Sequence, residues 1–557
     1  MVTMKQLFKL SMISLLVSCV MIVTCDSDDV TSSLNDTFKY DHQAVITDDE
    51  VWMSDLTHVI NHDIYIQDAA VTIEPGAIIR MAENASINVM SHGVLIADGA
   101  ADSPILFTRQ EDSDYWKQIY FSPNSSTRCL LNYCIFEYGG NDQAYPAIIY
   151  CDNADVAIMN STISSSAAYG VYLAGTCSRM KFDNNTIKDN ARAPLITAIT
   201  NLGIIGRGDY LGNADDYIEV NSGALSSDVV LIEHVVPYYF TDNITIRSGR
   251  LSIAESCSLL FAEARGVQVV ENGALSLNSS GRSIWITGYE KSNGYWQGIN
   301  IDSKAPSILN NCVIEYGGQS TRHPANISVE SGQNTITNCT IRRSMGYGIY
   351  VGSDCQMTFL NNIIEENTIA PLSMPVSSAV LISGNQFKLS SRYIELRGGD
   401  RDGLITGEVM LDYCEIPYFV TDDIIIKYGS LIVGSGVNLL MADNAMIEVL
   451  EGGGFVANGS TRMITITSQS KFSGAWKGIY FGPQIRQTHC SLNFCRIMYG
   501  GGDDEHPANI YCDNSSPCIT NCVIEQSLGY GIYLAGNASP VLINNTFFSN
   551  LLGPTNN

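Results

Sequence analysis

The densest group of chemically capable side chains lies in the stretch GGGDDEHPAN. Asp503, Asp504, Glu505 and His506 follow closely after Tyr499. Carboxylate oxygens are the ligands that Ca²⁺ prefers, so a calcium site is one interpretation of this stretch. A solvated polar turn is the other interpretation and the one that the pattern favours. We therefore assign no metal ligand and no cofactor.

Two earlier places in the chain have the same framework and different polar side chains. Tyr138 precedes Asp142, and Tyr316 precedes Arg322 and His323; each tyrosine is followed by two glycines, as Tyr499 is. Loops that vary in charge within constant surroundings are typical of recognition sites on a rigid scaffold, although unconstrained drift produces the same variation. The candidate binding residues are Tyr138, Asp142, Tyr316, Arg322, His323, Tyr499, Asp503, Asp504 and His506.

No acidic residue recurs in all three units at a place that would indicate a catalytic role. Hydrolysis of a glycosidic bond needs two convergent carboxyl groups, and elimination needs a base with groups that stabilise charge. Glu137 and Glu315 occupy matching places, but Met498 stands at the third. Methionine cannot transfer a proton, so this position predicts no acid-base role, and we assign no catalytic residue.

The charge balance excludes one class of partner. The chain of 557 residues carries 31 basic and 57 acidic residues, a formal charge of -26. Such a surface repels phosphate backbones and anionic lipid surfaces. Nucleic acid is therefore not an expected partner, and any membrane contact must come from a dedicated anchor.

Long repeats organise the chain. Trp116, Trp296 and Trp476 stand 180 residues apart within the similar strings SDYWKQI, NGYWQGI and SGAWKGI. We predict three tandem units, over residues 50–216, 217–396 and 397–557, of which the last is truncated. The tryptophans are expected to be buried in the wall of the fold. The alternative is an exposed row of rings that stacks against sugar rings.

A shorter period inside each unit predicts the fold. Asparagines recur at intervals of 28 and then 23 or 24 residues, and in the first unit each stands three residues before an isoleucine. They are Asn132, Asn160, Asn184, Asn310, Asn338, Asn361, Asn493, Asn521 and Asn544. Short alternating strands at this spacing are too brief for a helical pair and fit one coil of a β-solenoid, with asparagines stacked from coil to coil. The longer first interval indicates about five inserted residues after each Tyr-Gly-Gly motif, which should bulge from one face.

From about residue 50 onwards the sequence resembles the right-handed parallel β-helix proteins of the pectin-lyase-like superfamily. The strings VTIEPGAIIRMA, LNYCIFEYGG and YGVYLAG are similar to the repeat units of secreted and surface β-helix proteins. The resemblance implies an all-β right-handed parallel β-helix of about twenty-two coils, on the order of 100 Å long. It leaves the activity open, because the superfamily includes polysaccharide lyases, hydrolases and adhesins.

The sixteen cysteines do not form an evident disulfide framework. Cys134, Cys312 and Cys495 occupy matching places, while Cys339 and Cys522 match Ser161 in the first unit. A bridge would not tolerate that serine, so we expect most cysteines to be small core residues. Oxidation of some pair remains the alternative for an exported protein.

The N-terminus predicts export. Lys5 and Lys9 precede an apolar run that ends at Thr24 and is short for a membrane span. Residues 1–24 are interpreted as a signal peptide, with Cys25 as a lipidated residue because Ile22 to Cys25 resembles a lipobox, although Thr24 departs from the usual small residue. Residues 25–49 form a polar tether, whose first acidic residues resemble a surface-export signal. The alternative is a plain signal peptide that is cut nearby.

These observations leave two classes of function, both outside the cell. The first is a non-catalytic lipoprotein on the outer-membrane surface that binds glycan, matrix or another protein. The second is a polysaccharide-degrading enzyme, a lyase or glycoside hydrolase, whose site is spread over neighbouring coils. Tandem near-copies favour binding, because repetition raises avidity whereas catalysis needs one cleft.

Overall fold

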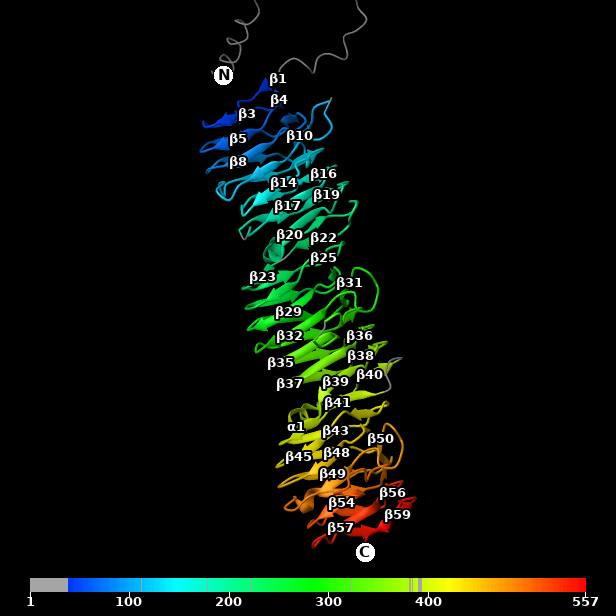
Figure 1. The fold of residues 1–557 in the computed structure, drawn as a ribbon. Coiled ribbons are helices and arrows are strands. Elements are labelled where there is room, and N and C mark those ends of the chain that lie inside the picture. The colour runs from blue at the N-terminus through cyan, green and yellow to red at the C-terminus, as the bar shows by residue number, and fades with distance from the viewer. Residues whose placement is uncertain are drawn as a thin grey trace, which may run out of the picture.

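The computed structural model describes residues 39–557, apart from 112, 178, 222, 321, 380, 381, 383 and 389–392. The described chain winds into an elongated rod with β1 (Lys39–Asp41) at one tip and the C-terminus at the other (Figure 1). It makes about 21 coils, and successive coils pair through parallel strands. The predicted all-β parallel β-helix is confirmed.

Helix is scarce in the described part of the chain. It contains one α-helix, α1 (Gly399–Asp402), and the short 3₁₀ segments η1 (Ile199–Ile204), η2 (Val376–Ser378) and η3 (Gln487–His489). None of its helices is long and apolar enough to cross a membrane. The signal peptide, Cys25 and most of the tether lie outside the described residues.

Three runs of strands carry the repeated motifs. The first comprises β10 (Ile105–Arg109), β11 (Ile119–Phe121), β13 (Cys134–Glu137), β14 (Ala147–Asp152), β16 (Thr162–Ser164) and β17 (Tyr169–Ala174). The second comprises β31 (Ile284–Gly288), β32 (Gly298–Ser303), β34 (Cys312–Glu315), β35 (Ala325–Thr337), β36 (Thr340–Arg342) and β37 (Tyr347–Leu360). The third comprises β50 (Ile464–Ser468), β51 (Gly478–Phe481), β53 (Cys495–Met498), β54 (Ala508–Asp513), β56 (Val523–Glu525) and β57 (Tyr530–Ala535).

The sheets wind around the rod. One sheet of 15 strands runs from β2 (Val45–Ile46) through β14 and β34 to β40 (Gln386–Lys388). It therefore holds β34, whose counterpart β13 belongs to a different sheet. Figure 1 shows this sheet passing from the left-hand side at β8 (Ile87–Met90) to the right-hand side at β38 (Ile363–Glu365). As a result β16, β36 and β56 all lie on the right-hand side, and equivalent motifs return to one side of the rod.

The repeated tryptophans are part of the wall, as predicted. Trp116, Trp296 and Trp476 are fully buried. Each indole N–H donates to the carbonyl of the residue before the Tyr-Gly-Gly motif, at 2.8, 2.8 and 2.7 Å. The motif makes room for the ring, because a Cβ on Gly139 would lie 2.7 Å from Trp116. The Trp and Tyr-Gly-Gly strings are therefore two halves of one packing contact.

The asparagines do form ladders. The Asn160 amide donates to Asn132 at 2.8 Å, and the Asn184 amide donates to Asn160 at 2.7 Å. Asn160 and Asn184 have positive φ angles of 50° and 57°, a conformation that asparagine tolerates better than most residues. A second, buried ladder uses the next residue, since Asn185 accepts from the backbone of Ser161 at 3.1 Å. The first ladder joins side chain to side chain, whereas the second satisfies backbone groups at the turns, since the Asn185 amide also donates to the Ile158 carbonyl at 2.9 Å.

The predicted register of the asparagines is wrong by one residue at the first turn of each run. Ile135 pairs with Thr162, so the partner of Asn160 is Tyr133 and not Asn132. Asn310 and Asn493 are displaced in the same way, because Val313 pairs with Thr340 and Arg496 with Val523. The first interval is therefore 27 residues, and the inserted segment is shorter than predicted by one residue.

The cysteines are core residues. All fourteen in the described range are free thiols, and twelve of them are buried. Cys134, Cys312 and Cys495 line the interior with at most 1% of their surface exposed. The prediction of a core role is confirmed for these residues, while Cys19 and Cys25 lie outside the described part.

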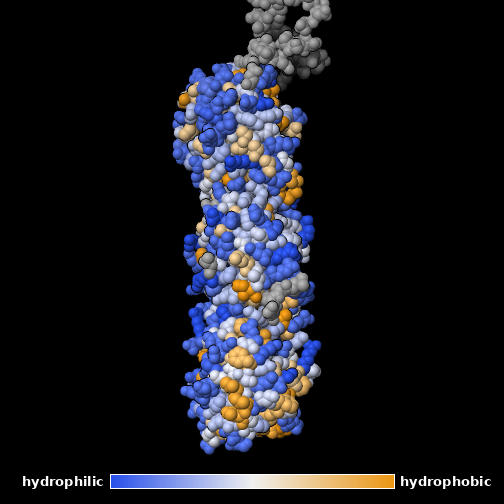
Figure 2. All heavy atoms as spheres, turned by 45° about the vertical axis from the view of Figure 1, so that its right-hand side comes forward, coloured by the Kyte–Doolittle hydropathy of each residue, from blue (hydrophilic) through white to orange (hydrophobic). Residues whose placement is uncertain are grey.

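The outer surface of the rod is mostly hydrophilic (Figure 2). Apolar patches gather towards its lower, C-terminal end. The exposed apolar residues of the last coils are Leu528, Val541, Leu542, Ile543, Phe548, Leu551 and Leu552.

Candidate binding faces

The loop after the first Tyr-Gly-Gly motif is a compact turn. The Asp142 carboxylate accepts from the backbone N–H groups of Ala144 at 2.8 Å and Tyr145 at 3.1 Å. This cap places Tyr145 against the outside of the β-helix. The centroid of its ring lies 4.7 Å from that of Tyr120 and 5.0 Å from that of Tyr150. Asp142 therefore positions an aromatic side chain that sequence reasoning did not select.

The second loop places an imidazole in a similar position. His323 stacks on Tyr350 with centroids 3.9 Å apart, and its Nε2 lies 3.4 Å from Glu330. Burial lowers the pKa of His323 below its ordinary value, against the opposing effect of Glu330. Arg322 is exposed. Of the two predicted residues in this loop, the structure thus packs one against the β-helix.

The third loop repeats this arrangement with an added acid. His506 lies 4.6 Å from Tyr480 and 4.7 Å from Tyr511, measured between ring centroids. Its Nδ1 is 2.7 Å from Asp503 Oδ2, while Asp503 Oδ1 accepts from the backbone of Glu505 at 3.1 Å. Burial raises the pKa of Asp503, but the hydrogen bonds from His506 and from the Glu505 backbone, together with the charges of His506 and Lys477, hold it below its usual value. Asp504 is exposed and contributes nothing to this contact.

The three loops therefore deliver one kind of group. Tyr145, His323 and His506, here called the loop rings, each stand directly before a Pro-Ala pair. His323 and His506 were among the predicted residues and Tyr145 was not, although this shared signal is present in the sequence at all three places.

The loop rings sit on ladders of outward-facing tyrosines. In the first ladder Tyr120, Tyr150 and Tyr172 are spaced 5.9 and 4.7 Å from centroid to centroid. The Tyr120 hydroxyl donates to Asp152 at 3.0 Å. All three rings are partly exposed, because alternate residues of a parallel strand point outward.

The third ladder copies the first. Tyr480, Tyr511 and Tyr533 are spaced 5.9 and 4.9 Å apart, and the Tyr480 hydroxyl donates to Asp513 at 3.1 Å. The second ladder is shorter, since Asn300 and Ser328 replace two of its rings. A face of stacked aromatic edges with hydrogen-bonding tips suits a ligand with both apolar and hydroxyl surface.

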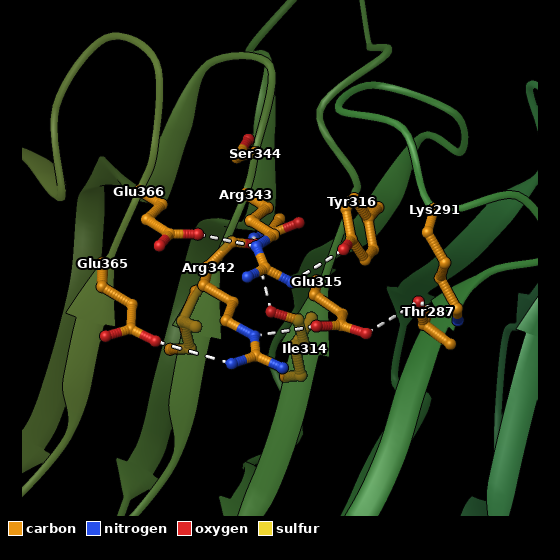
Figure 3. Close-up of polar contacts among 12 residues, drawn as sticks. Thr287, Lys291, Ile314, Glu315, Tyr316, Arg342, Arg343, Ser344, Glu365 and Glu366 are labelled. Atoms are coloured by element: carbon orange, nitrogen blue, oxygen red, sulfur yellow. Dashed lines mark hydrogen bonds and ion pairs between the residues drawn. The ribbon is translucent and has the colours of Figure 1, made fainter. Parts of the chain in front are cut away.

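The tyrosines of the Tyr-Gly-Gly motifs lie in a different setting from the loop rings. Arg109 covers the ring of Tyr138 at 4.2 Å, and Arg343 donates to the Tyr316 hydroxyl at 2.7 Å (Figure 3). Tyr499 instead lines an open groove. The predicted rings thus fall into two groups. His323 and His506 lie on the ladders, and the motif tyrosines lie on neighbouring strands, where the second copy has a charged column made of Lys291, Glu315, Arg342 and Glu365.

Comparison with known proteins identifies the family. The model of the right-handed β-helix region matches residues 46–223, 239–387 and 325–482, more than half of the chain. The chain belongs to the right-handed β-helix family. No curated protein matches it. A solved structure, that of the PL6 family alginate lyase AlyGC, aligns with 86% of this chain and 97% of its own at 8% identity and a TM-score of 0.23, and it carries no argument about function.

This β-helix protein also holds charge pairs between residues that are far apart in the sequence. Lys117 Nζ lies 3.0 Å from Asp63, and Lys477 Nζ lies 3.9 Å from Asp423. Burial raises the pKa of Asp423 above its ordinary value, and Lys477 opposes that rise. Within the described residues no group of three or more His, Cys, Asp or Glu side chains is placed to hold a metal ion.

Proposed function

We propose that this β-helix protein is a non-catalytic polysaccharide-binding lipoprotein of the outer-membrane surface. One observation supports the binding role above the others: a loop ring packs over outward-facing tyrosine in each of three repeated places. Aromatic rings held on a rigid scaffold stack against sugar rings at low cost in conformational entropy. Three such places along one rod provide avidity for a polymer, which a single site cannot do.

The test is retention of the purified protein in gels that contain a panel of polysaccharides. The variants Tyr145→Ala, His323→Ala and His506→Ala should each weaken retention several-fold, and the triple variant should lose it. Tyr428→Ala is the matched control, because Tyr428 is exposed outside the ladders. Full retention by the triple variant would remove the loop rings from the proposal.

A polysaccharide-degrading enzyme is the second candidate, and the third loop favours it. Asp503 orients His506 at 2.7 Å, an arrangement that suits general acid-base catalysis. Burial raises the pKa of Glu448, and the charge of His506 opposes that rise. New reducing or unsaturated ends from any retained polysaccharide, abolished in His506→Ala, would establish an enzyme and exclude the non-catalytic role.

The membrane attachment proposed here rests on the lipobox resemblance at Cys25. Cys25→Ala should release the protein from the membrane fraction, because the lipid would be its only anchor. A variant that still needs detergent would show that residues 10–24 remain as an uncleaved anchor. Protease shaving of intact cells distinguishes the outer surface from the periplasmic side.

A further inference from the structure

The last coil of the rod carries apolar side chains on its outer side. It is made of β58 (Val541–Ile543), β59 (Thr546–Phe548) and β60 (Gly553–Thr555). Phe548 is 53% exposed, and Leu551 and Leu552, in the loop before β60, are 71% and 54% exposed. Figure 2 shows apolar surface gathered at this end of a mostly hydrophilic rod.

The first copy has charged residues at the same outward places. The two coils align on the ladder residues Asn184 and Asn544. In this alignment Lys181, Asp183, Lys188 and Arg192 of the first copy correspond to Val541, Ile543, Phe548 and Leu552. The four charged residues are exposed in their own coil, which further coils follow on both sides. Their counterparts therefore point outward too, and they are not core residues that an open end has uncovered.

Charge is absent from the same end of the sequence. Residues 526–557 contain no Asp, Glu, Lys, Arg or His, whereas the whole chain has a formal charge of -26. At such a net charge, two copies repel one another wherever their acidic walls come close. An uncharged end allows two copies to touch, and contact through the tips keeps the acidic walls far apart, where salt screens them.

The strands of the last coil also offer free edges. Within the described chain β58, β59 and β60 are each the last strand of a sheet, with a neighbour on one side only. Leu542, which points inward, is 38% exposed, whereas its counterpart Phe182 is 1% exposed. Unpaired edges combined with contiguous apolar surface favour association with another chain.

The opposite tip is built differently. His42 packs there between Trp52 and His58, with ring centroids 4.1 and 5.2 Å away. Residues 39–50 of that tip include four acidic residues and one lysine. An acidic tip does not complement an apolar, uncharged one. The surface at the C-terminal end is therefore complemented best by a copy of itself.

We infer that the C-terminal end of the rod is a docking surface for the same end of a second copy, and that the two rods meet about a two-fold axis. A two-fold contact is self-complementary and closed, so association stops at two chains. The inference goes beyond the proposed function and does not depend on it, because it concerns the end of the rod and not the loop rings.

Sedimentation over a range of concentrations, with small-angle scattering of the same samples, tests this inference. Cys25→Ala serves as the parent, so that no lipid contributes to association. The parent should form a dimer as its concentration rises, with a maximum dimension about twice that of the monomer, because the rods join end to end. A dimer of rods packed side by side would keep the length of the monomer and would overturn the inference.

The double variant Phe548→Lys with Leu552→Arg should abolish the dimer. It installs the residues that the first copy carries at the equivalent places, so it should unfold at the same urea concentration as the parent. Val541→Lys, which copies Lys181, changes a different strand and should weaken the dimer at least about tenfold. Val51→Lys is the matched control, because Val51 is 61% exposed near the other tip, and it should leave the dimer unchanged.

Three outcomes would overturn the inference. The first is a parent that stays monomeric at every concentration, or a dimer that persists in the double variant. The second is growth beyond the dimer that Val51→Lys stops, which would show head-to-tail contact in place of a two-fold axis. The third is a monomeric parent that sediments with phosphatidylcholine vesicles while the double variant does not, which would assign the surface to a membrane.

Discussion

The Thr287 hydroxyl and the Glu315 carboxylate are joined by a hydrogen bond of 3.3 Å inside a charged column, and the equivalent pair, Thr467 and Met498, has none. The strands around the two pairs are alike in register. The difference therefore lies in the side chains and not in the backbone. The Thr287 hydroxyl has hydrogen-bond partners and the Thr467 hydroxyl has none, so the two copies allow the contribution of these hydrogen bonds to stability to be compared within one protein.

The first prediction compares the two threonines. Thr467→Val should leave the stability unchanged or raise it by about 1 kcal/mol, because it removes a buried hydroxyl that has no partner. Thr287→Val should lower the stability by about 1–3 kcal/mol, because Lys291 and Glu315 each lose a hydrogen bond. Urea unfolding of both variants measures the two effects. Equal destabilisation would mean that the Thr467 hydroxyl is satisfied in solution.

The second prediction concerns the tryptophan wall. Trp296→Ala should cost about 3–5 kcal/mol, since it empties a fully buried ring site. Trp296→Phe should cost less, mainly the hydrogen bond of 2.8 Å from the indole N–H to the Glu315 carbonyl. Trp285→Ala is the control, because 40% of that side chain is exposed. A loss at Trp285 as large as that at Trp296 would contradict the wall role.

The fold could be predicted because its constraints repeat along the sequence. The spacing of Trp116, Trp296 and Trp476 recurs with the Tyr-Gly-Gly motifs, and the two halves meet in one contact in each copy. The asparagine register was one residue off, because Tyr133 and Phe494 adopt the positive φ angles expected of asparagine, 48° and 53°. The spacing of residues along the sequence does not show which residue adopts the positive φ angle at such a turn.

The candidate site could be predicted only in part. The loops were found from their variable charge, and His323 and His506 do pack on outward tyrosines. Tyr145 was missed because it is neither charged nor variable in an obvious way. The groove of the third copy was visible in the sequence only as Met498 in place of a glutamate. The sequence analysis interpreted Met498 only as a position without an acid-base role, because its place opposite Thr467 and Glu525 on the neighbouring coils follows from the strand pairing and not from spacing in the sequence.

The third prediction concerns the thiols. Native protein should react very slowly with a thiol reagent, because burial raises the pKa of groups such as Cys134 and Cys512 to about 12 and excludes the reagent. Cys414 and Cys518, which are partly exposed, should react first. Unfolding in urea without a reductant should release all the thiols of the described range. A shortfall that a reductant restores would show that a pair such as Cys312 and Cys339 is oxidised in the exported protein.

The last prediction concerns the N-terminal end of the rod, where aromatic rings close the first coils. His42 packs 4.1 Å from Trp52, between centroids, and its Nε2 lies 3.0 Å from His58 Nδ1. Burial, followed by the charge of His58, lowers the pKa of His42 to about 4, while Glu50 opposes the shift. The unfolded chain takes up a proton at His42 near its ordinary pKa of 6.5, whereas the folded chain does not until about 4.

The unfolded state therefore binds more protons within that window, so stability falls as the pH drops from 6.5 towards 4. The contacts of a solenoid are between neighbouring coils, so the loss should be local. Hydrogen exchange, corrected for its intrinsic dependence on pH, should show faster opening of β4 (Thr57–Ile60) and β6 (Ala70–Ile73) at about pH 5 than at about pH 7, with the central coils unchanged. His42→Phe keeps a ring against Trp52 and cannot titrate, so it should remove most of the effect. If that variant opens as readily at low pH as the parent, another group controls the N-terminal end.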